Sequence, residues 1–402
     1  MKLLCLIDNL GSGGAQRQLV TLAVGLKKRG HEVRFLTYFP PDHFLPLLQA
    51  ADIPCQVISP CSHLQRGLAI RRILRQGWQD VVLAFLEGPC LYAELAQIPR
   101  QRWGLVAGER LADQQMNPRT GRWFRQGHRL ADAVVCNSHT NRLMLVRALR
   151  FLKRKIATVY NTVDLELFRP ALAPHAVDNG SAKAIRIVVA GSYQEKKNMM
   201  GVAKALLCLN RTQCSPPVVV DWFGAMPADP IPFNRAERFV AENGLGESLR
   251  FHPATLDIAG EYARADAVGL FSFYEGLPNV VCEGMACGKP IILSNVCDAG
   301  NLVLDGTNGF LCDPSSPESM ANAIGRLTAL SFEARRKMGL ASRALAERLF
   351  DTQIGIERYE QILQSVVRRA KFSADCSWPT AVPESAVRTV KEWANDCQAR
   401  PE

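Results

Sequence analysis

The most informative stretch of this chain reads Ser272-Phe-Tyr-Glu-Gly-Leu-Pro-Asn-Val-Val-Cys-Glu-Gly-Met-Ala-Cys-Gly-Lys-Pro290. Pro278 suits the first position of a helix, because an N–H at that position would have no partner within the helix. The apolar residues after it are spaced as in a helix that packs against a core. Glu275 therefore precedes the start of a predicted helix, and Glu283 lies inside that helix.

The start of this predicted helix is suited to bind an anion. Its first backbone N–H groups and the positive end of the helix dipole attract a phosphate. A carboxylate on either side accepts hydrogen bonds from the hydroxyls of a sugar. This combination points to a nucleotide-sugar. In the alternative interpretation, Glu275 only caps the helix and Glu283 is solvated.

The spacing of the two glutamates is not informative by itself, because Glu384 and Glu392 in the tail are equally far apart. Their setting is informative. It resembles the signature of the retaining glycosyltransferases of family 4, which have the GT-B fold and carry two glutamates in a setting of the form EGLPN…E.MA.GKP. The resemblance implies that Glu275 contacts the donor sugar and that Glu283 contacts the ribose. It assigns the donor-binding backbone amides to Gly276, Leu277 and Asn279.

Length and composition predict two domains. A chain of 402 residues with 48% hydrophobic content is too long for one ordinary core. Short apolar runs alternate with amphipathic stretches, which is typical of α/β proteins with parallel sheets covered by helices. The predicted strands are 2–7, 32–37, 80–85, 103–107, 132–136 and 156–159 in a first series, and 185–190, 217–223, 249–252, 266–272 and 290–294 in a second.

The two series predict two doubly wound, Rossmann-like domains that face each other across a cleft, because ligands of such sheets bind beyond the carboxyl ends of the strands. We expect an acceptor-binding domain at 1–170 and a donor-binding domain at 185–350. A linker at 171–184, marked by a Pro, a Gly, an Asn and a Ser, joins them. The resemblance implies that a helix at 351–370 crosses back to the first domain. Residues 371–402 form an extension outside this plan.

A glycine loop, Gly11-Ser-Gly-Gly-Ala-Gln-Arg17, follows the first predicted strand and opens a helix. Glycine lets a backbone approach a phosphate closely. The competing interpretation is the dinucleotide fingerprint G-x-G-x-x-G, which fails because its last position holds Gln16. Family 4 carries a similar GGA element, and this likeness implies that Gly13 and Gly14 line the diphosphate site.

The second domain opens with Ala190-Gly-Ser-Tyr-Gln-Glu-Lys-Lys-Asn198, which is similar to the family's G-R-x-x-x-x-K-N turn. The resemblance places the phosphate-binding lysine at Lys197. A fixed ammonium stabilises the negative charge that grows on a departing diphosphate. The alternative, a solvated lysine, suits Lys196 better. Ser192 stands where many relatives have Arg, so Lys196 or Arg17 is expected to supply the missing phosphate contact.

The acceptor side gives weaker signals. Gly108-Glu-Arg110 resembles a subgroup of polysaccharide and lipid-linked-glycan transferases. Glu109 and Arg110, with Arg17, are therefore the acceptor-binding candidates. A second possibility is that Glu109 and Arg110 brace the donor phosphates, and the alternative to both is a plain salt bridge. Further along the chain, the turn that begins at Tyr160 matches the family's YNGVD…F.P element. Its expected role is structural, because Asn and Asp are good turn formers.

The positive charge is concentrated in the first half of the chain. The net charge is +10, and residues 1–175 hold 24 Lys and Arg against 12 Asp and Glu. The densest segment is 142–155, which has an apolar face, and Arg71, Arg72 and Arg75 form a smaller group. Such a surface suits anionic lipid headgroups or an anionic acceptor. The alternative is an ordinary helix packed inward. No nucleic-acid partner is expected, because no binding-module signature appears.

Thirteen cysteines without a C-x-x-C pair predict reduced thiols rather than a disulfide or zinc framework. We assign no metal site and expect no cofactor. The first apolar run ends at Asp8, which is short for a signal peptide and fits a buried strand. The expected location is the cytoplasm, with peripheral contact at the inner face of the cell membrane.

Taken together with these patterns, the resemblance implies a retaining, metal-independent hexosyltransferase. It would move a sugar from a UDP- or GDP-type donor to a glycan or lipid-linked acceptor, in the synthesis of a cell-surface polysaccharide or glycoconjugate. Lys197 and Glu275 are its predicted catalytic residues. Two alternatives stay open: an epimerase or phosphorylase with a similar site, and a binding protein without activity.

Overall fold

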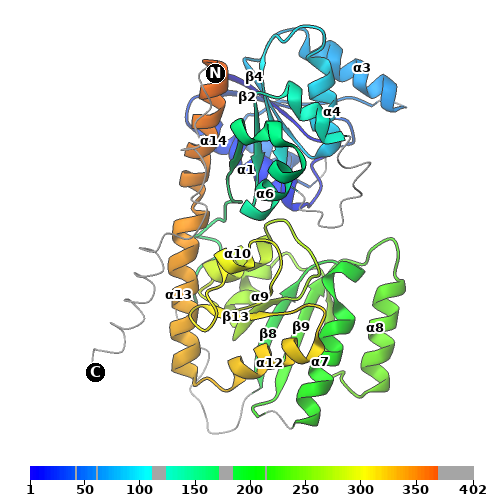
Figure 1. The fold of residues 1–402 in the computed structure, drawn as a ribbon, viewed down its shortest axis with the longest axis vertical. Helices are drawn as coiled ribbons and strands as arrows, with labels where there is room; N and C mark the ends of the chain where they lie inside the picture. Colours follow the sequence, from blue (N-terminus) through cyan, green and yellow to red (C-terminus); the bar gives the residue numbers. More distant parts are fainter. Residues whose placement is uncertain (41–42, 60–61, 111–123, 172–183, 213–214, 370–402) are drawn as a thin grey trace, which may run out of the picture. The chain divides into compact units, whose positions relative to one another are not determined.

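The computed structural model describes residues 1–40, 43–59, 62–110, 124–171, 184–212 and 215–369. The chain divides into two compact units (Figure 1). The first is formed by Met1–Thr162 and by the described residues from 352 to 369, and the second by Val163–Asp351. The predicted linker at 171–184 lies almost wholly outside the described residues, and the extension at 371–402 lies entirely outside them.

The first unit contains a seven-stranded parallel sheet in the order β3-β2-β1-β4-β5-β6-β7. Its strands are β1 Lys2–Leu6, β2 Glu32–Thr37, β3 Cys55–Val57, β4 Val81–Phe85, β5 Gly104–Glu109, β6 Ala133–Cys136 and β7 Ile156–Thr158. Every residue of the central strand β4 is buried. Near-continuous apolar strands are expected when helices cover both faces of a parallel sheet.

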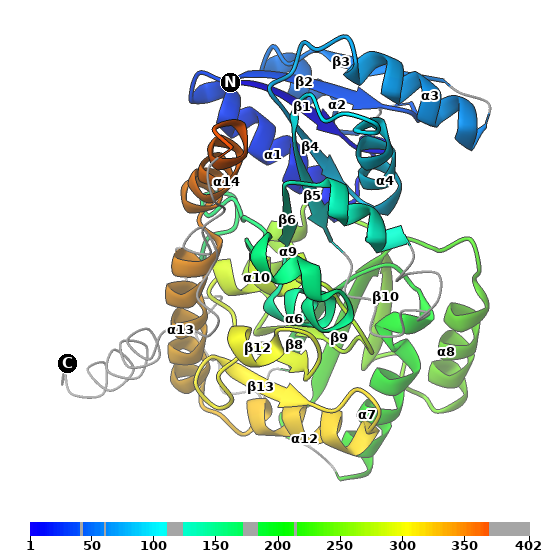
Figure 2. The same cartoon turned by 45° about the horizontal axis from the view of Figure 1, so that its top comes forward.

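The helices of the first unit are α1 Gly14–Lys28, α2 Leu45–Ala50, α3 His63–Leu74, α4 Glu87–Ala96, η1 Arg125–Leu130, α6 His139–Ala148, η2 Arg150–Arg154 and α14 Thr352–Val367. α3 and α4 lie side by side (Figure 2). The last helix, α14, packs against α1 and β5. Gly25 in α1 makes this contact close, because a Cβ atom there would lie 2.1 Å from Cδ1 of Ile356.

The second unit contains a six-stranded parallel sheet in the order β10-β9-β8-β11-β12-β13. Its strands are β8 Ile185–Ala190, β9 Val218–Gly224, β10 Leu249–Pro253, β11 Ala267–Leu270, β12 Ile291–Ser294 and β13 Gly309–Cys312. Its helices are η3 Glu195–Lys197, α7 Met199–Arg211, α8 Ile231–Glu242, α9 Ile258–Arg264, α10 Asn279–Ala286, α11 Ala299–Leu302, α12 Pro317–Thr328 and α13 Phe332–Phe350. Trp222 and Tyr262 are fully buried.

Both sheets are doubly wound, which confirms the predicted α/β fold. The strand order reverses between β1 and β4 in the first unit and between β8 and β11 in the second. Ligands of open α/β sheets bind beyond the carboxyl ends of strands at such a reversal. The loops after β8 and β11 are therefore the place to look for a site in the second unit.

One detail of the predicted helix after β11 was wrong. Pro278 was expected at the first helical position, but α10 begins at Asn279 and Pro278 is the residue before it. The physical reason is its backbone, which is extended with ψ at 110°. The order of the elements is unchanged, so Glu275 precedes the helix and Glu283 lies within it.

Candidate active site

The two loops that carry the predicted donor-binding residues lie next to each other in the second unit. One follows β8 and holds Lys197, and the other follows β11 and holds Glu275. Both leave the same edge of the sheet, because β8 and β11 are neighbouring parallel strands. Nζ of Lys197 lies 2.5 Å from Oε1 of Glu275, and the two side chains are only 14% and 15% exposed. The structure therefore brings the two predicted catalytic residues together.

Asn198 fixes the loop after β8. Its backbone is left-handed, with φ at 67°, a conformation that asparagine adopts more readily than most residues. Its side-chain oxygen accepts a hydrogen bond from the N–H of Gly201 at 3.1 Å and so caps α7. Its Nδ2 donates to the carbonyl oxygens of Phe271 at 3.2 Å and Pro314 at 2.7 Å. The residue after Lys197 thus ties this loop to the ends of β11 and β13.

Other residues of the same loop surround Lys197. A Cβ atom at Gly191 would lie 3.3 Å from Cε of Lys197, so the glycine leaves room for the lysine stem. Ser192, which stands where many relatives have Arg, is partly exposed. Nζ of Lys196 lies 5.9 Å from the centroid of the Tyr274 ring. Lys196 therefore lies close to the second loop as well.

Two buried serines hold the loop of Glu275. Oγ of Ser272 donates to Oε1 of Glu275 at 2.8 Å, and Oγ of Ser294 donates to the carbonyl oxygen of Ser272 at 2.7 Å. Both serines are completely buried. The N–H of Phe273 donates to the carbonyl oxygen of Lys196 at 2.9 Å. The glutamate thus has a defined position between two loops that are hydrogen-bonded to each other.

The helix after this loop carries the second glutamate. Glu283 lies in α10 and is 5% exposed. Of the predicted amide donors, Gly276 and Asn279 are partly exposed, and Leu277 is buried. The side chain of Pro278, the residue before α10, makes no capping hydrogen bond. The structure thus contradicts the part of the alternative in which Glu283 is solvated, and it pairs Glu275 with Lys197.

The predicted glycine loop of the first unit lies at the start of α1, which begins at Gly14. Nε2 of Gln16 donates to side-chain oxygens of Asp8 at 3.2 Å and Asn9 at 3.3 Å, which follow β1. A Cβ atom at Gly13 would lie 2.2 Å from Oε1 of Gln16, so the glycine admits this side chain. The glutamine that breaks the dinucleotide fingerprint therefore belongs to the loop's own structure. The next residue, Arg17, is partly buried, and its N–H donates to the carbonyl oxygen of Gly13 at 3.0 Å.

Glu109, a predicted acceptor-binding residue, is buried in a network of charged side chains. It is 4% exposed and lies 3.1 Å from Nε of Arg125 and 2.9 Å from Nε2 of His128. Nδ1 of His128 lies 2.5 Å from Oε1 of Glu94. Glu87 adds a further ion pair with Arg125 at 2.7 Å. Glu109 therefore organises the end of β5 rather than presenting a free carboxylate at the surface.

The pKa values in this network follow from burial and pairing. Burial works to lower the pKa of His128, but its hydrogen bonds to Glu109 and Glu94 outweigh burial and raise the pKa to about 9. Burial works to raise the pKa of Glu109, yet His128 and Arg125 leave it below its usual value. For Glu94, burial prevails and the pKa is raised. A charged histidine between two carboxylates is the arrangement that these directions support.

The plain salt bridge of the alternative joins Glu109 to Arg125, and Arg110 does not pair with Glu109. Its guanidinium lies 3.7 Å from the centroid of the Phe85 ring and donates to Oδ1 of Asn161 at 3.0 Å and to the hydroxyl of Tyr359 at 2.5 Å. Burial lowers its pKa. Arg110 therefore joins the end of β5 to the predicted structural turn and to α14.

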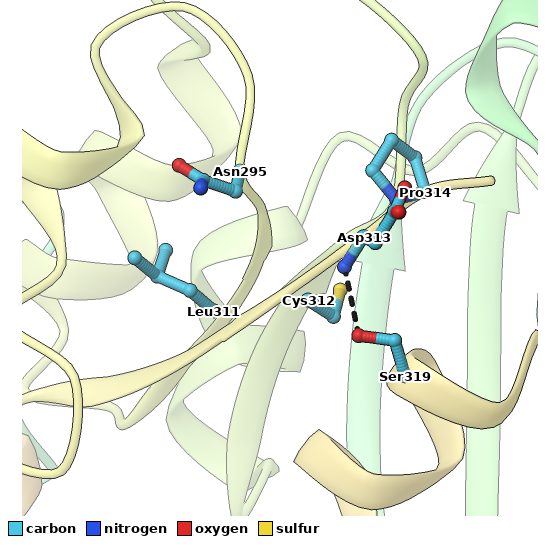
Figure 3. Close-up of a pocket in the computed structure, with 6 residues that line it drawn as sticks. All are labelled: Asn295, Leu311, Cys312, Asp313, Pro314 and Ser319. Atoms are coloured by element: carbon cyan, nitrogen blue, oxygen red, sulfur yellow. Dashed lines mark hydrogen bonds between the residues drawn. The ribbon is translucent and has the colours of Figure 1, made fainter. Parts of the chain in front are cut away.

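A pocket of about 440 Å³ lies in the second unit at the ends of β12 and β13 (Figure 3). It is lined by Asn295, Leu311, Cys312, Asp313, Pro314 and Ser319. The N–H of Asp313 donates to Oγ of Ser319 at 3.0 Å. Because the carbonyl oxygen of Pro314 accepts the hydrogen bond from Asn198, the pocket adjoins the loop of Lys197. The described residues contain no group of three or more His, Cys, Asp and Glu that could hold a metal ion.

Sequence reasoning missed several of these residues. Asn198 directly follows Lys197, and Ser272 begins the most informative stretch, so both stood within motifs that had been recognised. His128 and Arg125 had no such signal. Their positions beside Glu109 depend on how the chain returns after β5, which no local pattern indicates.

Comparisons with known proteins agree with this geometry. The family model described as "Glycosyl transferases group 1" matches residues 184–329. The model described as "Glycosyltransferase Family 4" matches residues 12–167. Together the two matches cover more than half of the chain.

Two relatives match most of the chain. D-inositol 3-phosphate glycosyltransferase of Xylanimonas cellulosilytica is 26% identical over 84% of this chain and 88% of the relative. An α-1,4-N-acetyl-D-galactosaminyltransferase of Campylobacter jejuni, whose name gives an undecaprenol-linked acceptor, is 24% identical over 78% of this chain and 85% of the relative.

A solved structure shares the fold. HepE from Anabaena, in complex with UDP and glucose, superposes with a TM-score of 0.78 and 21% identity over 91% of this chain and all of that chain. With two doubly wound sheets and matches to both family models, this chain belongs to the group 1, family 4 glycosyltransferases and is an enzyme of the GT-B type.

Proposed function

We propose that this glycosyltransferase moves a sugar, with retention of anomeric configuration, from a nucleoside diphosphate sugar to a glycan or lipid-linked acceptor. The observation that carries this proposal is the contact of Lys197 with Glu275 beyond β8 and β11. It joins a cation suited to a diphosphate and a carboxylate suited to sugar hydroxyls at one edge of the sheet.

Each site residue has a role in this proposal. Lys197 binds the diphosphate, and Glu275 binds hydroxyls of the donor sugar. Glu283 binds the ribose, because one carboxylate can accept hydrogen bonds from both ribose hydroxyls. Gly13 and Gly14 remain predicted contacts of the diphosphate.

The proposed chemistry is a substitution at one face of the sugar. The bond between the anomeric carbon and the diphosphate oxygen breaks, and the acceptor oxygen bonds to the same carbon from the same side. The acceptor proton passes to the departing phosphate oxygen. Lys197 lowers the barrier, because negative charge grows on the diphosphate as its bond breaks. We propose that this cation and the backbone amides suffice, so that transfer needs no metal ion.

The relatives suggest which substrates to test first. The structure of HepE contains UDP and glucose, which favours a UDP-sugar donor over a GDP-sugar. The Campylobacter jejuni relative is named for an undecaprenol-linked acceptor, which favours a lipid-linked glycan. A role in the synthesis of a surface polysaccharide or glycoconjugate follows from these two choices.

We also propose peripheral contact with an anionic membrane, and the structure favours α3 as its location. Leu64 and Leu68 are 74% and 57% exposed on a helix that also carries Arg72. By contrast, Leu145 and Leu149 of the basic segment 142–155 are buried, so that segment packs inward. None of the helices in the described part of the chain is long and apolar enough to span a bilayer.

A donor screen tests the proposed function. UDP- and GDP-sugars are incubated with the protein and extracted membrane lipids, and products are identified by mass. Lys197→Ala should reduce transfer by more than about a hundredfold, since it removes the charge that stabilises the leaving group. Lys204→Ala, which changes an exposed lysine of α7, is the matched control and should keep most of the activity. Undiminished turnover by the Lys197 variant would refute the role of that residue.

The same screen separates the two alternatives. A donor that is isomerised or hydrolysed without any acceptor would identify an epimerase or phosphorylase-like enzyme. A protein that binds no nucleotide-sugar in a thermal-shift panel would be a non-catalytic relative. Intact Lys197 and Glu275 in direct contact argue against the second outcome.

A further inference from the structure

The contact between Lys197 and Glu275 has a consequence for the order of events, and this inference rests on the proposed function. The carboxylate of Glu275 lies 2.5 Å from the ammonium of Lys197 and neutralises its charge. A diphosphate needs the same ammonium for a charge-assisted hydrogen bond. The carboxylate of Glu275 and the diphosphate therefore compete for the ammonium of Lys197.

The geometry of the carboxylate shows which atom is contested. Within the described residues, Lys197 and Ser272 both donate to Oε1 of Glu275. The other carboxylate oxygen, Oε2, is thus the one left for a sugar hydroxyl. Oε1 keeps one donor, the hydroxyl of Ser272, when the lysine turns away.

The surroundings allow the lysine to turn while the glutamate stays in place. Ser272 is completely buried, and its carbonyl oxygen is held by Ser294. Its hydroxyl is therefore fixed by the end of the sheet. The stem of Lys197 lies against Gly191, which has no side chain to confine it.

We propose that Glu275 competes with the diphosphate for Lys197, and that Ser272 is a positioning residue that holds the carboxylate when the lysine turns to the phosphate. With the intact nucleotide-sugar, hydroxyls of the sugar replace the lysine at the carboxylate, so the carboxylate keeps its hydrogen bonds and little binding energy is lost. After transfer the diphosphate carries no sugar, and Glu275 draws Lys197 back. The pair that binds the donor thus weakens the binding of the product.

Equilibrium binding of UDP by calorimetry tests this competition, with GDP used instead if the donor screen selects a guanosine donor. Glu275→Gln keeps the size of the side chain but cannot neutralise Lys197. It should bind UDP about tenfold more tightly than the wild type, the scale of one charge-assisted hydrogen bond, while turnover falls. Lys197→Ala should lose UDP binding.

A pair of serine variants tests the positioning role. In Ser272→Ala, the carboxylate of Glu275 has no hydrogen-bond donor whenever Lys197 binds UDP. When the UDP-sugar is bound instead, hydroxyls of its sugar donate to this carboxylate. The variant should therefore weaken the binding of UDP more than the binding of the UDP-sugar. The dissociation constant of UDP divided by that of the UDP-sugar should rise severalfold. Ser342→Ala also removes one completely buried hydroxyl, which donates to the backbone carbonyl oxygen of Asn308 at 3.0 Å and does not hold Ser272. The ratio of dissociation constants in this control should equal that of the wild type. An equal rise of the ratio in both variants would overturn the positioning role of Ser272.

The outcomes separate this inference from the proposed function. A folded wild-type protein that binds neither UDP nor GDP overturns both. UDP binding that is lost in Lys197→Ala but is unchanged or weaker in Glu275→Gln overturns the competition and leaves the donor site in place. Tighter binding of UDP by Glu275→Gln supports the competition.

Discussion

His128 is a buried histidine whose charge is set by two glutamates. Its ring nitrogens lie 2.5 Å from Glu94 and 2.9 Å from Glu109. Both nitrogens can donate a hydrogen bond only when the ring is protonated. Pairing therefore outweighs burial and raises its pKa to about 9. The folded protein keeps a proton that an unfolded chain releases near pH 6.5.

This difference predicts how stability changes with pH. The contribution of His128 is fully present below its unfolded pKa of about 6.5, and it is lost as the pH rises through the folded value of about 9. We expect the free energy of unfolding to fall across this window by up to about 3 kcal/mol. Denaturant titrations at a series of pH values measure the loss. His128→Gln should remove this part of the pH dependence. If the free energy of unfolding of the variant still fell with pH as steeply as that of the wild type, the pH dependence would belong to other groups.

Single residues were predictable where they belong to a continuous motif. Lys197 and Glu275 were found because each stands at a fixed place in a contiguous pattern. Their contact was not predictable, because it depends on β8 and β11 being neighbours. The same holds for Ser294, which reaches Ser272 across 22 residues of sequence. Glu109 was recognised, but its burial with His128 was not, since the histidine approaches it from another part of the fold.

At the level of elements, the turn between β8 and α7 depends on one asparagine. Asn198 caps α7, donates to the ends of two other strand connections and adopts a left-handed backbone. Losing the cap alone costs about 1 kcal/mol. Two buried carbonyl oxygens would lose their donor in addition.

Three variants of Asn198 separate these contributions. Asn198→Ala should destabilise the protein by about 2–4 kcal/mol, since it loses the cap and both donors and strains the backbone. Asn198→Gly loses the same cap and the same two hydrogen bonds, but glycine adopts the left-handed backbone without strain. This variant should be about 1 kcal/mol more stable than the alanine variant. Asn198→Asp keeps the cap. Denaturant unfolding measures all three, and an alanine variant as stable as the glycine variant would contradict the importance of the left-handed backbone.

The sequence predicted eleven strands at the right places but missed β3 and β13. β3 spans only Cys55–Val57 at the edge of its sheet, and it is mostly exposed, so it has no apolar run. β13 begins with Gly309, which a sequence pattern assigns to a turn. The structure requires glycine there, because a Cβ atom would lie 2.0 Å from the carbonyl oxygen of Ile291 on the neighbouring strand. Edge strands and glycine-containing strands are therefore the elements that periodicity does not reveal.

Over the whole molecule, the excess positive charge belongs to the first 175 residues. The sequence pattern favoured the basic segment 142–155 as the membrane contact, but Leu145, Leu149 and Leu152 of this segment are buried. Leu143 of this segment is 49% exposed, whereas Leu64 and Leu68 of α3 are 74% and 57% exposed. A sequence cannot make this distinction, because both helices are amphipathic and only their neighbours decide which apolar residues are covered.

The surface of α3 predicts binding to anionic vesicles. Leu64 and Leu68 are one turn apart on the helix and can enter the lipid interface, while Arg71, Arg72 and Arg75 face anionic headgroups. Two of these arginines also donate to the carboxyl end of α4, Arg71 to Leu95 at 3.2 Å and Arg75 to Ile98 at 2.7 Å. Arg72 is the exposed one. The leucines and Arg72 are therefore the side chains to change, because the other two arginines hold the helix in place.

Co-sedimentation with vesicles of phosphatidylcholine, with and without phosphatidylglycerol, tests this surface. The wild type should bind only the anionic vesicles, and binding should weaken as salt screens the charges. The double variant Leu64→Ser and Leu68→Ser should bind more than about tenfold less, since two leucines no longer leave water. Leu256→Ser, which changes a leucine that is 96% exposed in the second unit, is the matched control and should bind as the wild type does. Equal binding by wild type and double variant, or binding that ignores the charge of the lipid, would show that α3 is not a membrane surface.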